Sequence, residues 1–226
     1  DGRQERDRLG EAQRATQERR LHATSEPRLR PRRDLDAAAV EVLIYQLVTV
    51  SGERMGKRRG NVITLNELAE AIGVDAARYF LVERSHDQML DIDLDLAVET
   101  SSKNPVFYVQ YAHARCQSIL RKAVEEGLEV GGVGPTHVPE GPERTLVRRL
   151  AEWPDITSTA AELRAPHRIV TWVHELAADF HAFHHDLHVL HEDADTRAFR
   201  LSTVRATGEA LTRGLGLIGV DAPDRM

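Results

Sequence analysis

Apolar residues recur at helical spacing through most of the chain beyond residue 97. The last such run places Leu201, Val204, Leu211, Leu215 and Ile218 on one face. The same periodicity predicts helices over 97–125, 143–153, 156–190 and 196–217. Because the connections between them are short, we expect an antiparallel bundle of about four or five helices.

Glycines and prolines mark the expected boundaries of these helices. Pro105 is expected to kink or restart the first helix, because proline cannot donate within a helix interior. Residues 127–142 are rich in glycine and proline and are expected to link two helices. Gly214, Gly216 and Gly219 are expected to end the last helix.

Before the bundle, the pattern predicts a strand, a turn and a cationic loop. The apolar run 42–50 is typical of a buried strand, and Ser51 with Gly52 supplies the turn. Residues 53–61 then combine four cations with two glycines. Backbone N–H groups at glycines and cationic side chains favour phosphate binding, and a basic surface turn is the alternative.

Two short helices are expected to follow this loop, over 65–72 and 75–83. Thr64 and Glu67 have the spacing of a capping box at the start of the first helix. Asp75 is a candidate N-cap for the second helix.

An alternating series of acidic and apolar residues follows the two short helices. If this segment is extended, it has one charged face and one apolar face, formed by Asp91, Asp93 and Asp95 and by Ile92, Leu94 and Leu96. A calcium loop is disfavoured, because its central glycine and distal glutamate are absent.

The first 36 residues differ in composition from the rest. They hold ten arginines and eight acidic residues but no aromatic residue, and no sustained apolar stripe. We expect disorder or an exposed, frayed helix. The chain also begins with Asp1 and not with methionine, which suggests a fragment or a processed product.

Composition excludes several function classes. The chain has 226 residues, of which 41% are hydrophobic, and a formal net charge of −6, so it is not a uniformly basic nucleic-acid binder. Its single cysteine, Cys116, excludes a disulfide framework or a cysteine zinc site within the chain. With no membrane-length apolar run and no signal-peptide pattern, a soluble, cytoplasmic protein without membrane contact is expected.

A local cluster of positive charge can still bind a nucleic acid. Arg115, Arg121 and Lys122 lie on one predicted helix and could meet a phosphate backbone despite the acidic average. A solvated helix surface is the alternative for these three residues.

Five blocks of the sequence follow one another in a recognisable order: 55–65, 73–81, 90–95, 104–115 and 219–226. In this order they closely resemble the second signature region and the C-terminal domain of arginyl-tRNA synthetases, a family of class I aminoacyl-tRNA synthetases. The resemblance extends over residues 37–226.

The resemblance implies a mainly α fold in two parts. Residues 37–96 would form the end of a class I Rossmann-type catalytic domain, namely a strand, a loop of the Lys-Met-Ser-Lys (KMSK) type and connecting helices. Residues 97–226 would form an α-helical anticodon-binding bundle of the DALR type. Residues 1–36 have no match in the family.

In this family the KMSK loop binds ATP. The matching positions here are Arg54, Met55, Gly56, Lys57 and Arg58, with Arg54 in place of the first lysine and Gly56 in place of the serine. Lys57 would be catalytic and would stabilise charge on the departing pyrophosphate. ATP with Mg²⁺, and arginine, are expected to bind only in the complete enzyme. Because the early His-containing class I signature is absent from this sequence, the isolated chain is expected not to aminoacylate tRNA.

The helical domain of the family binds the anticodon loop of arginine tRNA. Loop bases are recognised by stacking on aromatic rings and by hydrogen bonds to their edges. Gln110, Tyr111 and Arg115 lie in the matching block, and Met226 matches the terminal methionine of the family. Packing between helices is the alternative for Tyr111, although Tyr108 is the better core candidate.

Four histidines, His181, His184, His188 and His191, recur at spacings of three and four and would share one helical face. Neutral imidazoles so placed can bind zinc or copper. The family pattern instead implies a packing helix in which aromatic residues often replace His184 and His188. We therefore expect no metal site.

The resemblance implies a function in the complete enzyme. It would be an arginine–tRNA ligase that attaches arginine to its tRNA at the expense of ATP, with this chain supplying the KMSK-like loop and anticodon binding, as a monomer. The alternative is a catalytically silent tRNA-binding or structural module derived from such an enzyme.

Overall fold

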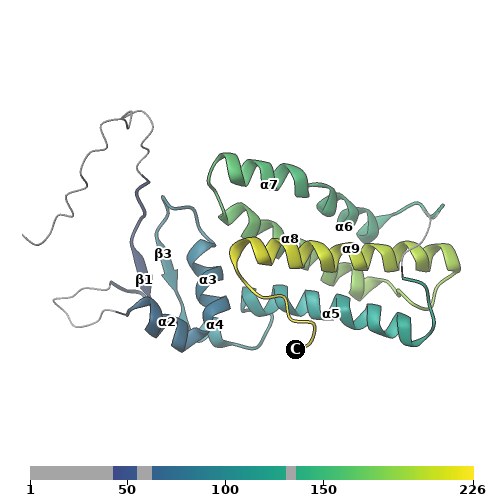
Figure 1. Cartoon of the computed structure of the whole chain (residues 1–226), viewed down its shortest axis with the longest axis horizontal. Coiled ribbons are helices and arrows are strands. Elements are labelled where there is room, and N and C mark those ends of the chain that lie inside the picture. The colour runs from purple at the N-terminus through teal and green to yellow at the C-terminus, as the bar shows by residue number, and fades with distance from the viewer. Residues whose placement is uncertain (1–42, 55–62, 131–135) are drawn as a thin grey trace, which may run out of the picture. The chain divides into compact units, whose positions relative to one another are not determined.

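The computed structural model describes residues 43–54, 63–130 and 136–226. All elements described below belong to one compact unit, Ile44–Met226. Most of its helices and strands are labelled in Figure 1.

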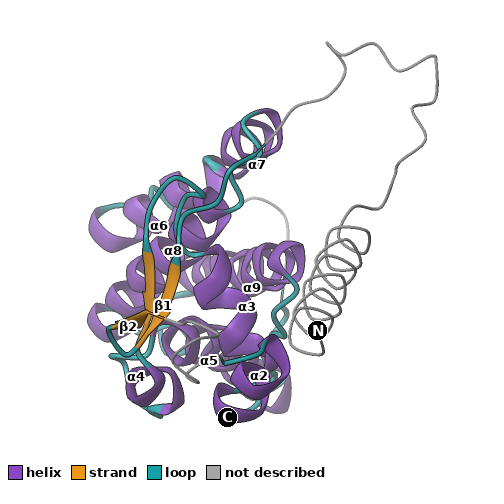
Figure 2. Ribbon diagram, turned by 90° about the vertical axis from the view of Figure 1, so that its left-hand side faces the viewer, coloured by secondary structure: helices purple, strands orange, loops and turns teal. Residues whose placement is uncertain are grey.

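A small three-stranded sheet begins this unit (Figure 2). Its strands are β1 (Val48–Val50), β2 (Glu53–Arg54) and β3 (Leu90–Ile92), in the order β2-β1-β3. β1 pairs antiparallel with β2 and parallel with β3. Ser51 and Gly52 both have positive φ, of 49° and 77°, as a two-residue hairpin turn requires. The predicted turn is confirmed.

The strand predicted over 42–50 is too long. Residues 43–47 have no regular structure and their side chains are exposed. The parallel ladder starts only where Val48 faces Leu90, because the partner strand itself begins at Leu90 after a turn. A run of apolar residues thus predicted the strand but not its first residue.

Two short helices follow, α2 (Leu65–Ile72) and α3 (Val74–Val82). The capping box is confirmed: Thr64 Oγ1 accepts from the Glu67 backbone N–H at 3.2 Å, and Glu67 accepts from the Thr64 backbone N–H at 2.7 Å. The N-cap predicted at Asp75 is wrong. Gly73, with φ of 85°, is the N-cap of α3, and the Asp75 carboxylate accepts hydrogen bonds from residues distant in sequence.

The acidic segment is extended only over β3. Asp93 ends the alternation, because its carboxylate caps α4 (Leu94–Val98) by accepting from the backbone N–H of Leu96 at 3.1 Å. The two faces that an extended segment would have therefore do not continue to Leu96. Asp91 remains on the strand, where it accepts from Thr49 Oγ1 at 2.5 Å and from the Gly52 N–H at 3.0 Å.

The helix predicted from residue 97 begins later. α5 (Pro105–Glu125) starts with Pro105 in its first turn, where a missing N–H costs nothing. Asn104 is its N-cap and accepts from the backbone N–H of Val106 at 3.1 Å. The restart at Pro105 is confirmed, since α4 has ended at Val98.

The remaining helices are α6 (Gly141–Ala151), α7 (Trp153–Glu162), α8 (His167–Asp186) and α9 (Ala194–Ile218). The single helix predicted over 156–190 is wrong: α7 and α8 are separate, because Arg164 adopts a positive φ of 49° ahead of Pro166. In the expected linker, 127–142, residues 127–130 and 136–140 are not helical. α6 begins at Gly141, which is within the last two residues of the predicted linker.

Only one of the three glycines expected to end the last helix does so. Gly219 has φ of 71° in the left-handed region and closes α9. Gly214 and Gly216 lie inside α9. Gly214 is buried against Val173 of α8, so its lack of a side chain permits close helix packing and does not break the helix.

The described helices α5 to α9 form the predicted antiparallel bundle (Figure 1). α5, α8 and α9 contact one another, and α6 and α7 pack on α8. The largest fully buried side chains of this bundle include Trp172, Phe180, Phe183, Leu146 and Leu211. α3 contacts α5, α8 and α9 and thus joins the sheet region to the bundle. No described helix has the length and apolar character that crossing a membrane requires.

Candidate functional site

The predicted ATP-binding loop lies largely outside the described residues. This holds for Met55, Gly56, Lys57 and Arg58. Arg54 is described as the last residue of β2, with its backbone opposite Thr49. The described flanks therefore place this loop between a hairpin strand and the capped start of α2.

The site that the structure does describe is built around Tyr111 on α5. Its ring stacks on Phe107, with centroids 6.0 Å apart and planes 7° from parallel, and on His181 of α8 at 5.8 Å and 22°. We call Phe107, Tyr111 and His181 the ring stack. Its α5 members are four residues apart, so they lie one turn from each other on the same face.

Arg115 continues this arrangement along α5. Its guanidinium lies 5.0 Å from the centroid of the Tyr111 ring and donates to the Tyr111 hydroxyl. Such a cation over an aromatic face holds the planar group in place while its remaining donors stay available. Tyr111 is 36% exposed, whereas Tyr108 is partly buried and packs on the core. The expected difference between these two tyrosines is confirmed.

The two histidines near Arg115, His181 and His184, have lowered pKa values. Burial lowers the pKa of His181, a hydrogen bond to the Tyr108 carbonyl raises it, and Arg115 lowers it further, so that the net shift is downward. Burial and the charge of Arg115 also lower the pKa of His184. Both rings are therefore neutral at neutral pH, and the positive potential at this position comes from arginine.

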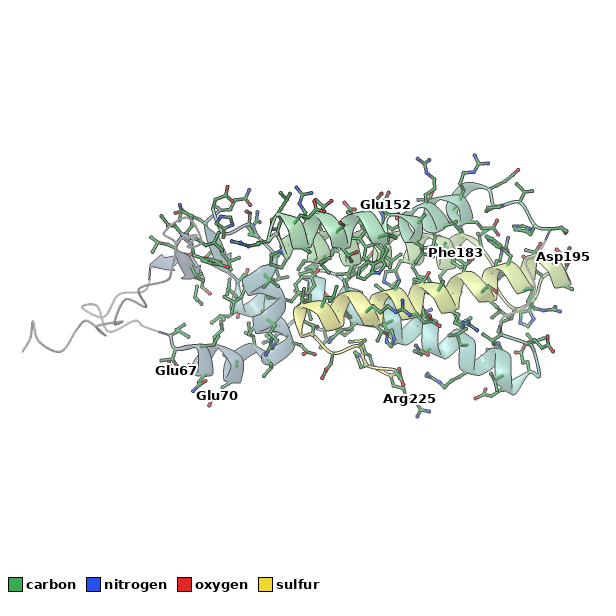
Figure 3. The ribbon with its side chains drawn as sticks, turned by 45° about the horizontal axis from the view of Figure 1, so that its top comes forward. Glu67, Glu70, Glu152, Phe183, Asp195 and Arg225 are labelled. Carbon is green, nitrogen blue, oxygen red and sulfur yellow. The ribbon has the colours of Figure 1, made fainter. Side chains whose placement is uncertain are left out.

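A cleft of about 420 Å³ opens next to Tyr111 and Arg115. Its other wall is the last segment of the chain, with Arg225 and Met226, which runs beside α5 (Figure 3). We call it the terminal cleft; it is lined by Tyr111, Ala114, Arg115, Ser118, Arg121, Asp224, Arg225 and Met226. Met226 is 56% exposed. The cleft thus combines an accessible ring, an accessible thioether and three arginines.

A second cleft of about 410 Å³ shares Arg115 and Ser118 with the terminal cleft. It extends toward Lys122 and the turn after α8, with His184 and His188 in its lining. The charged side chains that line the two clefts are four cations, Arg115, Arg121, Lys122 and Arg225, and one acid, Asp224.

Gln110 does not join this site. Its side-chain amide donates to Asp75 Oδ2 at 2.9 Å and to the Asp221 carbonyl at 3.0 Å. It lines a different cleft, of about 560 Å³, together with Asp75, Glu99 and Asp221. Of the four residues predicted to bind tRNA, the structure brings together Tyr111, Arg115 and Met226 only.

Two protein-family models match the chain. Residues 109–226, more than half of the chain, match the DALR anticodon binding domain, and residues 33–107 match the class I tRNA synthetase model of the M type. A curated arginine–tRNA ligase from Desulforamulus reducens is 44% identical over 194 residues, which cover 83% of this chain. The chain belongs to the arginyl-tRNA synthetase family.

Solved structures agree with this membership. A protein assigned as an arginyl-tRNA synthetase from Campylobacter jejuni superposes with a TM-score of 0.72 at 25% identity, covering 85% of this chain and 42% of that one. The arginyl-tRNA synthetase of Thermus thermophilus gives a TM-score of 0.65 at 26% identity, covering 80% and 35%.

The chain spans about a third of the length of the curated ligase, 35%. It corresponds to the C-terminal portion of an arginyl-tRNA synthetase, with a DALR domain after the end of a class I catalytic domain. The enzymes of this family are aminoacyl-tRNA ligases.

Within this DALR domain, the predicted histidine face is wrong. α8 ends at Asp186, so His188 and His191 lie beyond it and cannot continue the face of His181 and His184. The backbone carbonyl of His188 accepts from Arg200 at 2.5 Å. Across the described ranges, no group of three or more His, Cys, Asp or Glu side chains is arranged to hold a metal ion.

Sequence reasoning did not assign Ser118 or Arg225 to this site. Ser118 follows Tyr111 and Arg115 at spacings of seven and three, so helical periodicity alone could have found it. Arg225 had no periodic signal, because the last residues are not helical. His181 could not be paired with Tyr111 from sequence, since the two are on different helices.

Proposed function

We propose that this chain is the C-terminal part of an arginine–tRNA ligase and binds the anticodon loop of arginine tRNA. In the complete enzyme, ATP-dependent attachment of arginine to that tRNA would use the loop 54–58 of this chain. The observation that carries the proposal is the exposed Tyr111 ring, which contacts Phe107, His181 and Arg115 at the terminal cleft of a DALR domain.

The chemistry of the terminal cleft suits unpaired nucleotides. A base of an anticodon loop can stack on an aromatic or guanidinium plane, which is worth about 1–3 kcal/mol per base. Tyr111 and Arg115 supply these planes, and Met226 supplies an apolar contact from the opposite wall. Arg121 and Arg225 supply positive charge for the phosphates between the bases.

Gln110 has a supporting part in this proposal. Its amide is already bonded to Asp75 and to the backbone of Asp221. It would therefore hold the wall of the site and not read a base.

We also propose the domain boundaries 37–96 and 97–226, with residues 1–36 outside both domains. Support comes from the two family models, which meet between residues 107 and 109, and from the non-helical stretch between α4 and α5. A second domain that begins at residue 97 would include the end of α4 and the non-helical stretch that leads to Asn104, the N-cap of its first long helix.

The catalytic part of the proposal concerns Lys57. In the complete enzyme its ammonium would stabilise the departing pyrophosphate, and Arg54, Met55, Gly56 and Arg58 would line the phosphates of ATP, which enters with Mg²⁺. The chain alone would be inactive, because the sequence contains only the later of the two class I signatures. Arginine-dependent ATP–pyrophosphate exchange by the purified chain would contradict this. We also propose that the chain is a cytoplasmic monomer.

The alternative of a catalytically silent module is not favoured. The chain is 44% identical to a curated arginine–tRNA ligase across both parts of its described fold. That likeness includes the region matched by the class I synthetase model, which a module kept only for its bundle would not need.

The proposal is tested by RNA binding of matched variants. We expect Tyr111→Ala to weaken binding of an arginine-tRNA anticodon stem-loop about 5- to 150-fold at fixed salt, as the loss of one stacked base predicts. Tyr45→Ala is the control, because Tyr45 is 73% exposed and far from the matched DALR residues in sequence. Equal affinities of the two variants would reject the proposed site.

A further inference from the structure

The final residues of the chain, 219–226, have no helix or strand of their own. We call them the tail. Three α5 side chains hold its backbone: Gln110 donates to the Asp221 carbonyl at 3.0 Å, and Arg121 donates to the Asp224 carbonyl at 3.2 Å. Between them, His113 Nδ1 lies 3.0 Å from the Pro223 carbonyl. Since side-chain contacts replace secondary structure here, the cleft wall formed by Arg225 and Met226 depends on them.

The three donors share one face of α5. His113 lies three residues after Gln110 and eight before Arg121, and these spacings bring all three to the same side of a helix. The tail therefore follows α5 from its first turns toward its middle, as its end beside α5 in Figure 1 shows.

His113 differs from its two neighbours because it is buried, with 2% of its surface exposed. A carbonyl oxygen can only accept, so Nδ1 must carry the proton in the contact with Pro223. On the other side of the ring, Nε2 lies 3.0 Å from Thr212 Oγ1 and 3.1 Å from the Gln117 amide nitrogen. The Gln117 amide nitrogen can only donate, so it fits an unprotonated Nε2 and the same tautomer; the single hydroxyl hydrogen of Thr212 is shared with the Gly208 carbonyl at 3.0 Å.

His113 is thus bonded to three parts of the domain at once. Gln117 belongs to α5 itself, Thr212 belongs to α9, and Pro223 belongs to the tail. Arg121, by contrast, makes its tail contact at the exposed surface. A buried, fully bonded donor positions its acceptor more firmly than an exposed one, because water competes less for the bond.

We propose that His113 is a positioning residue that fixes the tail against α5 and thereby sets the wall of the terminal cleft that Met226 forms. The effect of His113 on RNA binding rests on the proposed function, whereas its effect on the position of the tail does not. Met226 is only three residues beyond Pro223, so release of that carbonyl would leave the wall held by the exposed contact of Arg121 with the Asp224 carbonyl.

Two substitutions separate the two sides of the ring. Asparagine places an amide N–H close to the position of Nδ1, so His113→Asn keeps a donor for Pro223. Glutamine places its amide closer to the position of Nε2, so His113→Gln loses that donor while remaining polar. The two variants therefore carry the same charge and differ in the position of their amide donor.

The experiment measures ¹⁵N relaxation of the backbone amides of Asp224, Arg225 and Met226, together with imidazole ¹⁵N shifts and circular dichroism of the full chain. We expect a protonated Nδ1 in the wild type, and an ordered tail both in the wild type and in His113→Asn. We expect order parameters below about 0.6 in the tail of folded His113→Gln. An ordered tail in folded His113→Gln would overturn the inference, whatever the RNA affinity.

RNA binding then separates this inference from the proposed function. With the tail present, His113→Gln is expected to bind the anticodon stem-loop about tenfold more weakly; after deletion of residues 222–226, it is expected to add no further loss. An equal loss with and without the tail would overturn the inference. A wild type that binds no RNA, but whose tail is released by His113→Gln, would refute the proposed function and leave the positioning role intact.

If His113→Gln does not fold, Thr212→Val supplies the second variant, since Thr212 is exposed. It removes the hydroxyl that lies 3.0 Å from Nε2, and we expect partial loss of tail order at an unchanged helix content. A fully ordered tail with an unchanged imidazole spectrum would count against the role of His113.

Discussion

Arg200 of α9 donates from Nε to Oε1 of Glu143 in α6 at 2.6 Å, and both side chains are buried. Arg200 also reaches the His188 carbonyl at 2.5 Å and Glu192 at 3.0 Å. The other carboxylate oxygen of Glu143 lies 2.7 Å from His137 Nε2. One guanidinium therefore joins α6, the turn after α8 and α9 at the end of the bundle that borders the second cleft.

Replacing Arg200 alone is expected to destabilise the chain strongly. Arg200→Met leaves the carboxylate of Glu143 buried without its cation, and the free energy of unfolding should fall by about 3–5 kcal/mol. Urea denaturation measures this. Arg213→Met is the control, because the Arg213 side chain is 69% exposed in its pair with Glu209, and it should change stability by less than about 1 kcal/mol.

The same carboxylate predicts a pH dependence. Burial by itself would raise the pKa of Glu143, but hydrogen bonds from His137, Arg200 and the Glu140 backbone outweigh burial, and the net pKa is lowered. A lowered folded-state pKa stabilises the fold above the unfolded-state value, about 4.3, and this contribution is lost as pH falls through the folded-state pKa. Glu143→Gln should therefore show a flatter loss of stability between about pH 5 and pH 3. An unchanged slope would contradict the assignment.

Two of the three glycines inside α9, Gly214 and Gly216, should respond oppositely to alanine. A Cβ at Gly214 would overlap Cγ1 of Val173, so Gly214→Ala is expected to cost about 1–3 kcal/mol. A Cβ at Gly216 meets nothing within 4 Å, so Gly216→Ala should be neutral or stabilise by up to about 1 kcal/mol. Thermal unfolding compares them. Adding Val173→Ala to Gly214→Ala tests the cause, because it removes the overlapping group.

Cys116 is expected to be chemically inert in the folded chain. Burial raises the pKa of its thiol, and its side chain has no exposed surface. Since the thiolate is the reactive form, labelling by a thiol reagent at neutral pH should occur only upon unfolding. Labelling rates should rise with urea in parallel with the unfolded fraction. Rapid labelling without urea would show that α5 is less well packed than described.

Local signals in the sequence predicted local structure well. Thr64 and Glu67 form their capping box because both partners lie within one turn. Pro105 begins its helix because the first turn needs no N–H from it. Asp75 failed as a predicted cap because its carboxylate binds Gln110 and the backbone N–H of Asp221, which are 35 and 146 residues away.

Contacts between helices account for most of what the sequence did not predict. Gly214 resembled a helix end, but its role is set by Val173 on another helix. In the site, Tyr111 and Arg115 were predicted from one block, whereas their partner His181 comes from α8. The contribution of His113 to the tail depends on Pro223, 110 residues later, and no spacing rule connects the two.

The most direct measurement compares the affinity of the wild-type chain for two RNA hairpins that share one stem, over a series of salt concentrations. One carries the anticodon loop of an arginine tRNA, and the other carries a loop of equal length with the anticodon bases exchanged. We predict that the arginine loop binds about 5- to 150-fold more tightly at every salt concentration, because stacking on Tyr111 and Arg115 adds to phosphate attraction. Equal affinity for both hairpins, or no binding even at low salt, would contradict the account.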